Sequence, residues 1–406
     1  MAAPTVVVIG GSFAGVGIVK KLDTTLKTKV ALCPSRRVFL PHPQANLILI
    51  DEKDHWFLNI AALRTLTEPN FAQHIWVPYT DLMTNNPNSR VVHGRVVEIR
   101  AKEVTLDNDE KIAFDYLVIA TGSSVPPPGK SLHKTKAGGV AEADTILQAV
   151  KAANSIAIVG GGDHAAVGVE LAGEIATDLP GKSVTIIHSG ANLLTANSPN
   201  AKSIRAIDKQ LASLNVKVIL NSRVLNAEGS NSPIPNKLQG YSLSKCTLKT
   251  DKGDIVEADV TFLCTGISRP NSDVAKGLGD AVFDSNGYIN TELTGQVKGF
   301  KHIFAAGDVS NLDSLKLAYT ANAHAVLVGT NLASLIQKPD AVLKSHTPMK
   351  PGSLVIVAIG RKGGVLQTPI GVFGAWTVKN VKSRDLFIGS KWKDMNLKLD
   401  YKPPAN

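Results

Sequence analysis

The chain has 406 residues, of which 44% are hydrophobic and 19% are charged. This length is too great for one compact core and predicts two or three domains, with a composition ordinary for a soluble α/β protein. Lys and Arg number 44 against 34 Asp and Glu, and the net charge of +10 favours anionic ligands or an anionic membrane surface. Nucleic acid is not favoured, because no block of Lys and Arg is interleaved with aromatic residues.

The cysteines, the N-terminus and the apolar stretches indicate where in the cell the protein is located. The three cysteines, Cys33, Cys246 and Cys264, form no local pair, so we expect a reducing compartment and no disulfide framework. No basic segment precedes an apolar core at the N-terminus, which argues against secretion, and Ala2 excludes N-myristoylation. No apolar stretch of about 18 residues is free of charge. We therefore expect a cytoplasmic protein without an integral membrane segment, with peripheral contact to a membrane or lipid droplet left open.

The first expected elements are a strand at 6–9, a glycine turn and a helix at 16–26. A dinucleotide turn needs one glycine to bend sharply and another to let helix and strand pack closely, and Gly10 and Gly15 supply these. Ser12 replaces the usual middle glycine but is small enough to let a pyrophosphate reach the backbone N–H groups. The turn predicts a binding site made of Gly10, Gly11, Ser12, Phe13, Ala14 and Gly15.

The next apolar strand, 47–50, ends in Asp51 and Glu52. An acidic residue at this position accepts hydrogen bonds from an adenosine ribose, and we expect Asp51 or its neighbour to do so. The separation from Gly15 is 51 − 15 = 36 residues, whereas about 20 is usual. The proline-rich stretch Cys33–Pro43 is expected to be a loop insertion that accounts for the excess.

Strands expected at 91–99, 103–106 and 114–120 lead to Thr121-Gly122 and a stiff proline linker. A second strand–glycine–helix unit begins at 156–159. Its turn has two registers: a local G-x-G-x-x-A motif from Gly160 to Ala165, or a register in which Asp163–Ala165 is inserted and Gly168 and Glu170 complete the turn. Both share Gly160 and Gly162. An acid inside this turn would oppose a pyrophosphate, so we expect Asp163 to point away.

His188-Ser189 follows the next strand, 184–188, at the ribose-reading position. Because no carboxylate is present at this position, the sequence favours neither NADH nor NADPH. A strand at 260–264 then leads to Thr265-Gly266, which repeats Thr121-Gly122 and indicates two modules, the second inserted in the first.

The third motif, Gly307-Asp308, follows a strand at 303–306 and precedes a helix at 317–335. Its backbone and carboxylate can hold flavin ribitol and phosphate. The sequence thus predicts an α/β fold with two Rossmann-like dinucleotide-binding domains and a small C-terminal α+β domain with strand material at 354–359 and 372–378. The expected boundaries are 1–130 and 269–340 for the FAD-binding domain, 131–268 for the NAD(P)H-binding domain, and 341–406 for the C-terminal domain.

This arrangement resembles the FAD-dependent pyridine nucleotide-disulfide oxidoreductases, and especially their apoptosis-inducing-factor-like branch. The similar segments include Asn59–Arg64, Leu317–Tyr319 with His324, Lys382–Phe387 and Ser390–Lys393. The resemblance implies FAD contacts at Gly10–Ala14, Arg64, Val96 and Asp308, with Lys130 and Lys316 as weaker candidates near the flavin. A guanidinium at Arg64 can pair with flavin phosphate or stabilise a reduced flavin.

The resemblance implies a hydride taken from NADH or NADPH, bound FAD, and a quinone-type acceptor. Because no local cysteine pair can relay electrons, we expect them to leave the flavin directly, with no side-chain acid or base and no metal site required. A ferredoxin or rubredoxin reductase remains an alternative, as does an NAD(P)H-sensing binding protein with slow turnover. The physiological acceptor stays open, and the chain is expected to be a monomer or a homodimer.

Overall fold

The computed structural model describes residues 3–26, 29–33, 38–42, 45–162, 166–194, 198–225, 240–266 and 269–403. Its first layer is a five-stranded parallel sheet in the order β21-β11-β1-β4-β7. The strands are β1 (Thr5–Ile9), β4 (Asn46–Asp51), β7 (Arg90–His93), β11 (Tyr116–Ile119) and β21 (Ile303–Ala305). They are short apolar runs, as expected for a parallel sheet that is covered on both faces.

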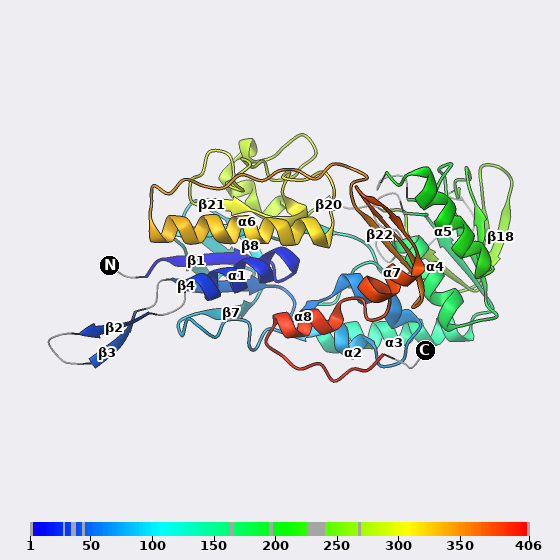
Figure 1. Cartoon of the computed structure of the whole chain (residues 1–406), viewed down its shortest axis with the longest axis horizontal. Helices are drawn as coiled ribbons and strands as arrows, with labels where there is room; N and C mark the ends of the chain where they lie inside the picture. The colour runs from blue at the N-terminus through cyan, green and yellow to red at the C-terminus, as the bar shows by residue number, and fades with distance from the viewer. Residues whose placement is uncertain are drawn as a thin grey trace.

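Different layers cover the two faces of this sheet. Helices α1 (Phe13–Thr25) and α6 (Ala318–Gln337) pack against each other over one face (Figure 1). The antiparallel sheet of β8 (Val96–Ile99), β9 (Glu103–Leu106) and β10 (Lys111–Ala113) contributes to the apolar cluster on the other. The first module is thus built of three packed layers.

The second module has its own sheet, in the order β15-β14-β13-β19-β16, with the first four strands parallel. Its strands are β13 (Ser155–Val159), β14 (Ser183–Ile187), β15 (Lys217–Ile219), β16 (Tyr241–Ser242) and β19 (Val260–Leu263), and its helices are α3 (Lys136–Ala152), α4 (Val167–Asp178) and α5 (Ala201–Ser213). After this module the chain returns to the first sheet as β21, so the second sheet is inserted between strands of the first. The predicted α/β fold, with a second Rossmann-like module inserted in the first, is confirmed.

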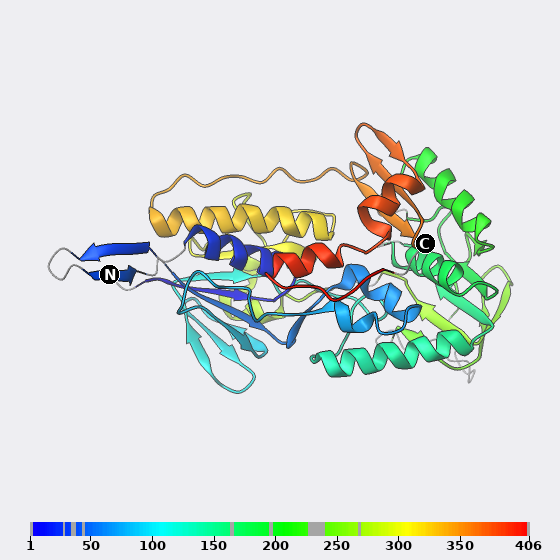
Figure 2. The ribbon, with the colours of Figure 1, turned by 60° about the horizontal axis from the view of Figure 1, so that its bottom comes forward.

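The C-terminal part contains a three-stranded antiparallel sheet, β22 (Val355–Ile359), β23 (Gly363–Thr368) and β24 (Gly371–Phe373), with α7 (Ala375–Val378) and α8 (Ile388–Asp394). Val355 and Val357 join the apolar core of the second module, whereas Ile388 and Met395 join that of the first. Between α6 and β22 the chain runs back along α6 as an extended segment, residues 338–354, which we call the strap (Figures 1 and 2).

Shorter elements connect these layers. They are β5 (His55–Phe57), η1 (Asn59–Leu66), α2 (Ala72–Ile75), β6 (Trp76–Pro78), β12 (Ser123–Ser124), β17 (Cys246–Lys249), β18 (Ile255–Ala258), β20 (Arg269–Pro270), η3 (Asp273–Leu278), η4 (Asp280–Val282), η5 (Gly307–Val309) and η6 (Lys379–Ser383). Among the described residues, no helix has the length and apolarity needed to cross a membrane.

Three expectations about elements need correction. The strand expected at 91–99 is two strands, β7 and β8, separated by a turn at Gly94. The segment 372–378 forms β24 and then helix α7, because Gly374 separates them and the following turn is helical. Within the expected loop Cys33–Pro43, β2 (Lys29–Cys33) and β3 (Val38–His42) pair as an antiparallel hairpin that projects from the body of the molecule (Figure 1). Residues 163–165, the second insertion, lie outside the described residues.

Candidate cofactor sites

The first glycine turn has the shape that a bound pyrophosphate requires. Gly10 adopts a φ of +103°, and a Cβ there would lie 2.3 Å from the Ala120 carbonyl oxygen. A Cβ at Gly15 would lie 1.8 Å from the Gly10 carbonyl oxygen, so α1 can begin this close to β1 only with glycine at that position. Ser12 makes no side-chain cap, and the first turn of α1 contains no acid. The N–H groups at the start of α1 are therefore suited to an anion, and this turn fits a dinucleotide.

Asp51 lies against this turn. Its carboxylate accepts hydrogen bonds from the backbone N–H of Gly11 and, at 2.6 Å, from that of Lys53. The Tyr79 hydroxyl donates to the Gly11 carbonyl oxygen at 2.6 Å and lies on the same side of Gly11 as Asp51. Burial raises the pKa of Asp51 to about 6. Glu52, in contrast, pairs with Lys134 at 3.7 Å on the surface, so Asp51 is the better candidate for the ribose. Tyr79 had no signal in the sequence, because its contact depends on the fold.

Asp308 belongs to a small polar cluster beside the first turn. A Cβ at Gly307 would lie 3.1 Å from that of Ala14, which places the third motif next to the first. The Asp308 carboxylate accepts from the Ser123 hydroxyl at 2.8 Å and lies 3.7 Å from the Lys130 ammonium. Lys130 also donates to the Ser123 carbonyl oxygen at 2.6 Å, and burial lowers the pKa of its ammonium.

Other predicted residues have different surroundings. The Thr121 hydroxyl donates to the Asn271 carbonyl oxygen at 2.7 Å, and Gly122 has a φ of +69°. Val96 is buried in the apolar core on the far face of the first sheet. The Lys316 ammonium bonds carbonyl oxygens of its own loop and lies 4.1 Å above the Tyr288 ring. The structure thus brings Lys130, but not Val96, into contact with Asp308.

The second glycine turn repeats the geometry of the first. Gly160 has a φ of +111°, and a Cβ there would lie 2.2 Å from the Cys264 carbonyl oxygen. A Cβ at Gly168 would lie 2.0 Å from the Gly160 carbonyl oxygen, just as Gly15 lies against Gly10. Gly162 (φ +103°) and Gly266 (φ +70°) also adopt a positive φ, which glycine tolerates best. Gly168 therefore has in this turn the place that Gly15 has in the first, as the register with the inserted residues predicts.

His188 occupies in the second module the place that Asp51 has in the first. Its side chain follows β14, is buried, and accepts a hydrogen bond at Nδ1 from the Gly161 backbone N–H at 3.1 Å. The ribose-reading position is therefore occupied by an imidazole that is fixed to the glycine turn.

Arg64 has partners that the sequence did not indicate. Its side chain has no exposed surface, and Nε and Nη2 donate to the two carboxylate oxygens of Glu174 at 3.0 and 2.9 Å. Nη1 and Nη2 also donate to the carbonyl oxygens of Arg384 and Ser383 at 3.0 and 2.6 Å. This placement joins η1 to α4 and to the C-terminal part, and does not bring Arg64 to Asp308. The expected contact between Arg64 and FAD gains no support from these bonds.

Glu174 is one of three acids on one side of α4, spaced four residues apart, which we call the acid stripe: Glu170, Glu174 and Asp178. Glu170 accepts from the Lys382 ammonium at 2.5 Å and from the Ala358 backbone N–H at 2.9 Å. Asp178 pairs with Arg361 at 2.9 Å, and Arg361 also reaches Glu68. The sequence showed Glu170 as part of the turn, but Lys382 lies 212 residues away and only folding reveals the pair.

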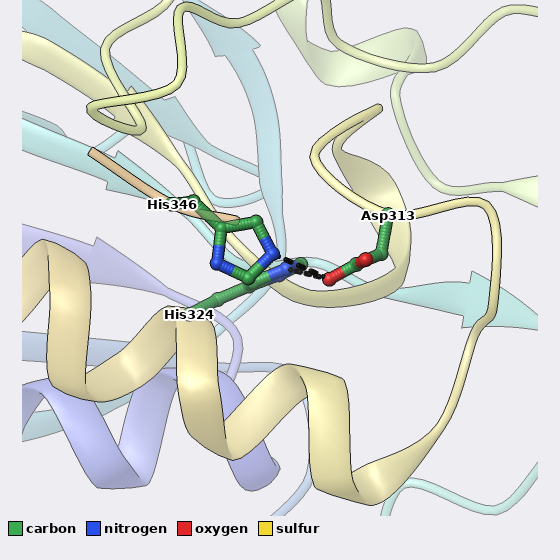
Figure 3. Close-up of side chains that lie close together, drawn as sticks. All are labelled: Asp313, His324 and His346. Carbon is green, nitrogen blue, oxygen red and sulfur yellow. Dashed lines mark hydrogen bonds and ion pairs between the residues drawn. The ribbon is translucent and has the colours of Figure 1, made fainter. Parts of the chain in front are cut away.

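A further cluster supports the Gly307 turn from behind. The imidazoles of His324 and His346 both bond one carboxylate oxygen of Asp313, at 2.9 and 2.7 Å, and the Met349 backbone N–H donates to the other at 2.6 Å (Figure 3). The other ring nitrogen of His324 accepts from the Gly307 N–H at 3.1 Å. Although burial acts to raise the pKa of Asp313, these hydrogen bonds lower it. The cluster ties the strap to the Gly307-Asp308 turn.

These three side chains are close enough together to suggest a metal site. However, Nδ1 of His324 receives a backbone N–H, so a neutral His324 carries its proton on Nε2, the atom that faces Asp313. A metal ligand at Nε2 would need that nitrogen free of its proton, with Nδ1 as the usual donor. The geometry therefore favours a hydrogen-bonded relay over a metal centre.

Comparisons with known proteins agree with this architecture. Residues 4–325 match the pyridine nucleotide-disulphide oxidoreductase family. Human ferroptosis suppressor protein 1 is 31% identical over 394 residues, covering 96% of this chain and 95% of that protein. Apoptosis-inducing factor homolog B of Dictyostelium discoideum is 29% identical over 402 residues, covering 96% of each.

Solved structures with the same fold include the sulfide:quinone oxidoreductase of Aquifex aeolicus, with a TM-score of 0.69, 19% identity and coverage of 98% of this chain and 93% of that one. The water-forming NADH oxidase of Lactobacillus brevis has a TM-score of 0.64 at 22% identity, covering 91% and 76%. Together with the two matching glycine turns, the family match shows that FAD and NAD(P)H are the cofactors. The chain belongs to the pyridine nucleotide-disulphide oxidoreductase family.

Proposed function

We propose that the chain is an FAD-dependent NAD(P)H oxidoreductase that delivers electrons to a quinone-type small molecule. The observation that carries this proposal is the equivalence of the two glycine turns, in which Gly15 and Gly168 lie against Gly10 and Gly160 in the same way. Two such turns in one molecule support two dinucleotides. A bound flavin would accept a hydride from the nicotinamide and return two electrons to the acceptor, which gains two protons as it becomes a quinol.

The thiols support an acceptor that meets the flavin directly. Cys246 and Cys264 are buried and unpaired, and burial raises the pKa of Cys264 to about 12. A thiolate is the reactive form of cysteine, so neither of these two side chains is suited to relay electrons.

The protein's own part is to bind and orient. The starts of α1 and α4 would receive the two pyrophosphates, Asp51 would hold the FAD ribose, and His188 would face the ribose of the nicotinamide dinucleotide. Asp308, with Lys130 and Ser123, would bind the flavin side chain. The Glu170–Lys382 pair lies in the first turn of α4, where Lys382 neutralises an acid that would otherwise oppose a phosphate.

Anaerobic stopped-flow mixing with NADH or NADPH tests this function. We expect the flavin absorbance near 450 nm to bleach and to return when a water-soluble quinone is added; a flavin that does not bleach would overturn the proposal. Gly160→Ala should retain FAD but lose bleaching, because the new Cβ would lie 2.2 Å from a carbonyl oxygen. Gly253→Ala is the matched control: its φ is also positive, at +86°, but nothing lies within 4 Å of the added Cβ, so it should bleach normally.

A further inference from the structure

A stretch of the C-terminal part has an unusual charge. Residues 341–384 contain seven Lys or Arg and no Asp or Glu. Arg361 and Lys382 are used by the acid stripe. Lys362 and Arg384 are exposed, Lys379 is half-buried, and none of these three forms a salt bridge with any residue that the structure describes. The stretch therefore carries three cations that have no salt-bridge partner among the described residues.

Large apolar side chains stand out from the same stretch. Ile370, in the turn between β23 and β24, is 88% exposed, and Trp376, on α7, is 80% exposed. Phe373 lies between them in sequence at 38%, and Val381 is 45% exposed. Helix α7 packs against β23 and β24, so the turn and the helix belong to one small unit (Figure 1). We call Ile370, Phe373 and Trp376 the apolar tip. Exposed apolar residues gathered in this way mark an interaction surface.

We infer that the apolar tip docks on an anionic lipid bilayer. Side chains exposed by 80% or more project from the surface and do not line a groove, which suits insertion into a deformable medium. Tryptophan prefers the level of the lipid headgroups, and the uncompensated lysines and arginine attract anionic lipid. A two-fold contact with a second copy would instead bring the same excess of positive charge from both copies to one interface.

The inference rests on the proposed function, and it adds that the protein carries out this function at a membrane surface. Lys382, which reaches Glu170 at the start of α4, lies six residues from Trp376. The apolar tip and the candidate nicotinamide site are thus linked through the short helical segment η6 (Lys379–Ser383). An acceptor dissolved in the bilayer would meet the protein on the side where this segment lies.

Vesicle co-sedimentation of the full-length flavoprotein tests the inference. We expect binding to phosphatidylcholine vesicles that contain phosphatidylserine, and binding roughly tenfold or more weaker to phosphatidylcholine alone. Ile370→Ser/Phe373→Ser/Trp376→Ser should weaken binding by at least about tenfold, because three inserted apolar side chains are lost. Lys362→Glu/Lys379→Glu should remove the preference for phosphatidylserine. FAD content and melting temperature check that the variants are folded.

A matched variant places three serines at apolar residues exposed elsewhere. Leu132, Ile255 and Val342 are 59%, 66% and 96% exposed, and Leu132→Ser/Ile255→Ser/Val342→Ser should bind vesicles like the parent. Fluorescence locates the contact, because Trp56 and Trp76 are buried and Trp392 is partly buried with its indole N–H bonded to the His74 carbonyl oxygen, whereas Trp376 is exposed. Vesicles should shift the emission to the blue in the parent but much less in Trp376→Phe, which still binds.

Several results would overturn this inference. They are a parent that does not bind vesicles, an apolar-tip variant that binds as well as the parent, and a control variant that loses binding equally. Self-association, or salt-sensitive capture of an acidic iron–sulfur protein, that depends on the apolar tip without vesicle binding would assign the surface to those partners instead. Vesicle binding needs neither nicotinamide nor acceptor, so it can fail while flavin reduction succeeds, and the reverse.

Discussion

Asp51 and His188 face equivalent backbone groups in the two modules, yet one is an acid and the other an imidazole. Each accepts a hydrogen bond from the N–H of the second glycine in its turn, Gly11 or Gly161. The backbone geometry therefore does not decide which dinucleotide binds. The charge of the side chain that ends the second strand of each module is one difference between the two sites.

At Asp51 this charge depends on pH. Burial raises its pKa to about 6, and a protonated carboxyl group can no longer accept hydrogen bonds from both ribose hydroxyls. FAD affinity should thus be constant above pH 7 and fall as pH decreases through 6, by about tenfold at pH 5 if one proton is coupled to binding. Quenching of flavin fluorescence by the apoprotein measures this. Asp51→Asn should bind FAD more weakly at neutral pH and show a much flatter dependence between pH 5 and 7; an unchanged slope would assign the titration to another group.

At His188 the charge should decide between the two nicotinamides. His188→Asp places a carboxylate where the 2′-phosphate of NADPH would lie, and kcat/KM for NADPH should fall roughly tenfold or more relative to that for NADH. His188→Asn is the control, since a neutral amide oxygen can still accept from the Gly161 N–H. Steady-state kinetics with both nucleotides gives the ratio. If the aspartate leaves this ratio unchanged, His188 does not face the ribose.

At the level of elements, η1 and α4 are joined by a buried ion pair whose role can be separated from cofactor binding. Burial raises the pKa of Glu174, and the Arg64 guanidinium opposes this rise. Arg64→Ala would leave that acid without a partner and should lower the free energy of unfolding by roughly 3–5 kcal/mol. The double variant Arg64→Met/Glu174→Leu removes both charges and should recover most of the loss.

Urea unfolding and the ratio of flavin to protein absorbance measure the two effects of these variants. We expect the double variant to keep FAD, because both side chains contact protein groups. A stable double variant without FAD would show instead that Arg64 binds the flavin. Arg100→Ala provides the comparison: its pair with Glu98 is 58% and 40% exposed, and its loss should change the free energy of unfolding by no more than about 1 kcal/mol.

At the scale of the whole molecule, the sequence predicts the fold well because its signals are local. A segment of about fifteen residues, with a glycine turn between an apolar strand and a helix, is enough to predict a dinucleotide-binding module. The three motifs also lie where parallel strands end. The C-terminal segment 372–378 misleads, since an apolar run of seven residues suits a strand as well as a turn of helix.

The sequence alone does not predict the contacts between distant segments. Arg64 had a good chemical reason to meet a phosphate, and only the fold shows Glu174 beside it. Ser123, Tyr79 and Lys382 lacked any signal, because each becomes part of a site through partners that lie far away or belong to the backbone. The register of the second turn was undecided for a similar reason: Gly168 is recognised by its distance to Gly160 and not by its spacing in the sequence.

The acid stripe of α4 has a consequence for motion. Its three carboxylates are held by cations from three separate parts of the chain: Arg64 before the insertion, Arg361 in the C-terminal sheet and Lys382 after it. A movement that swings α4 away from both η1 and the C-terminal part would break all three pairs, in which no side chain is more than 15% exposed, at a cost of several kcal/mol. The two dinucleotide modules should therefore keep a fixed orientation through turnover and melt together in one calorimetric transition. The nicotinamide would then enter and leave through local movement at its own glycine turn.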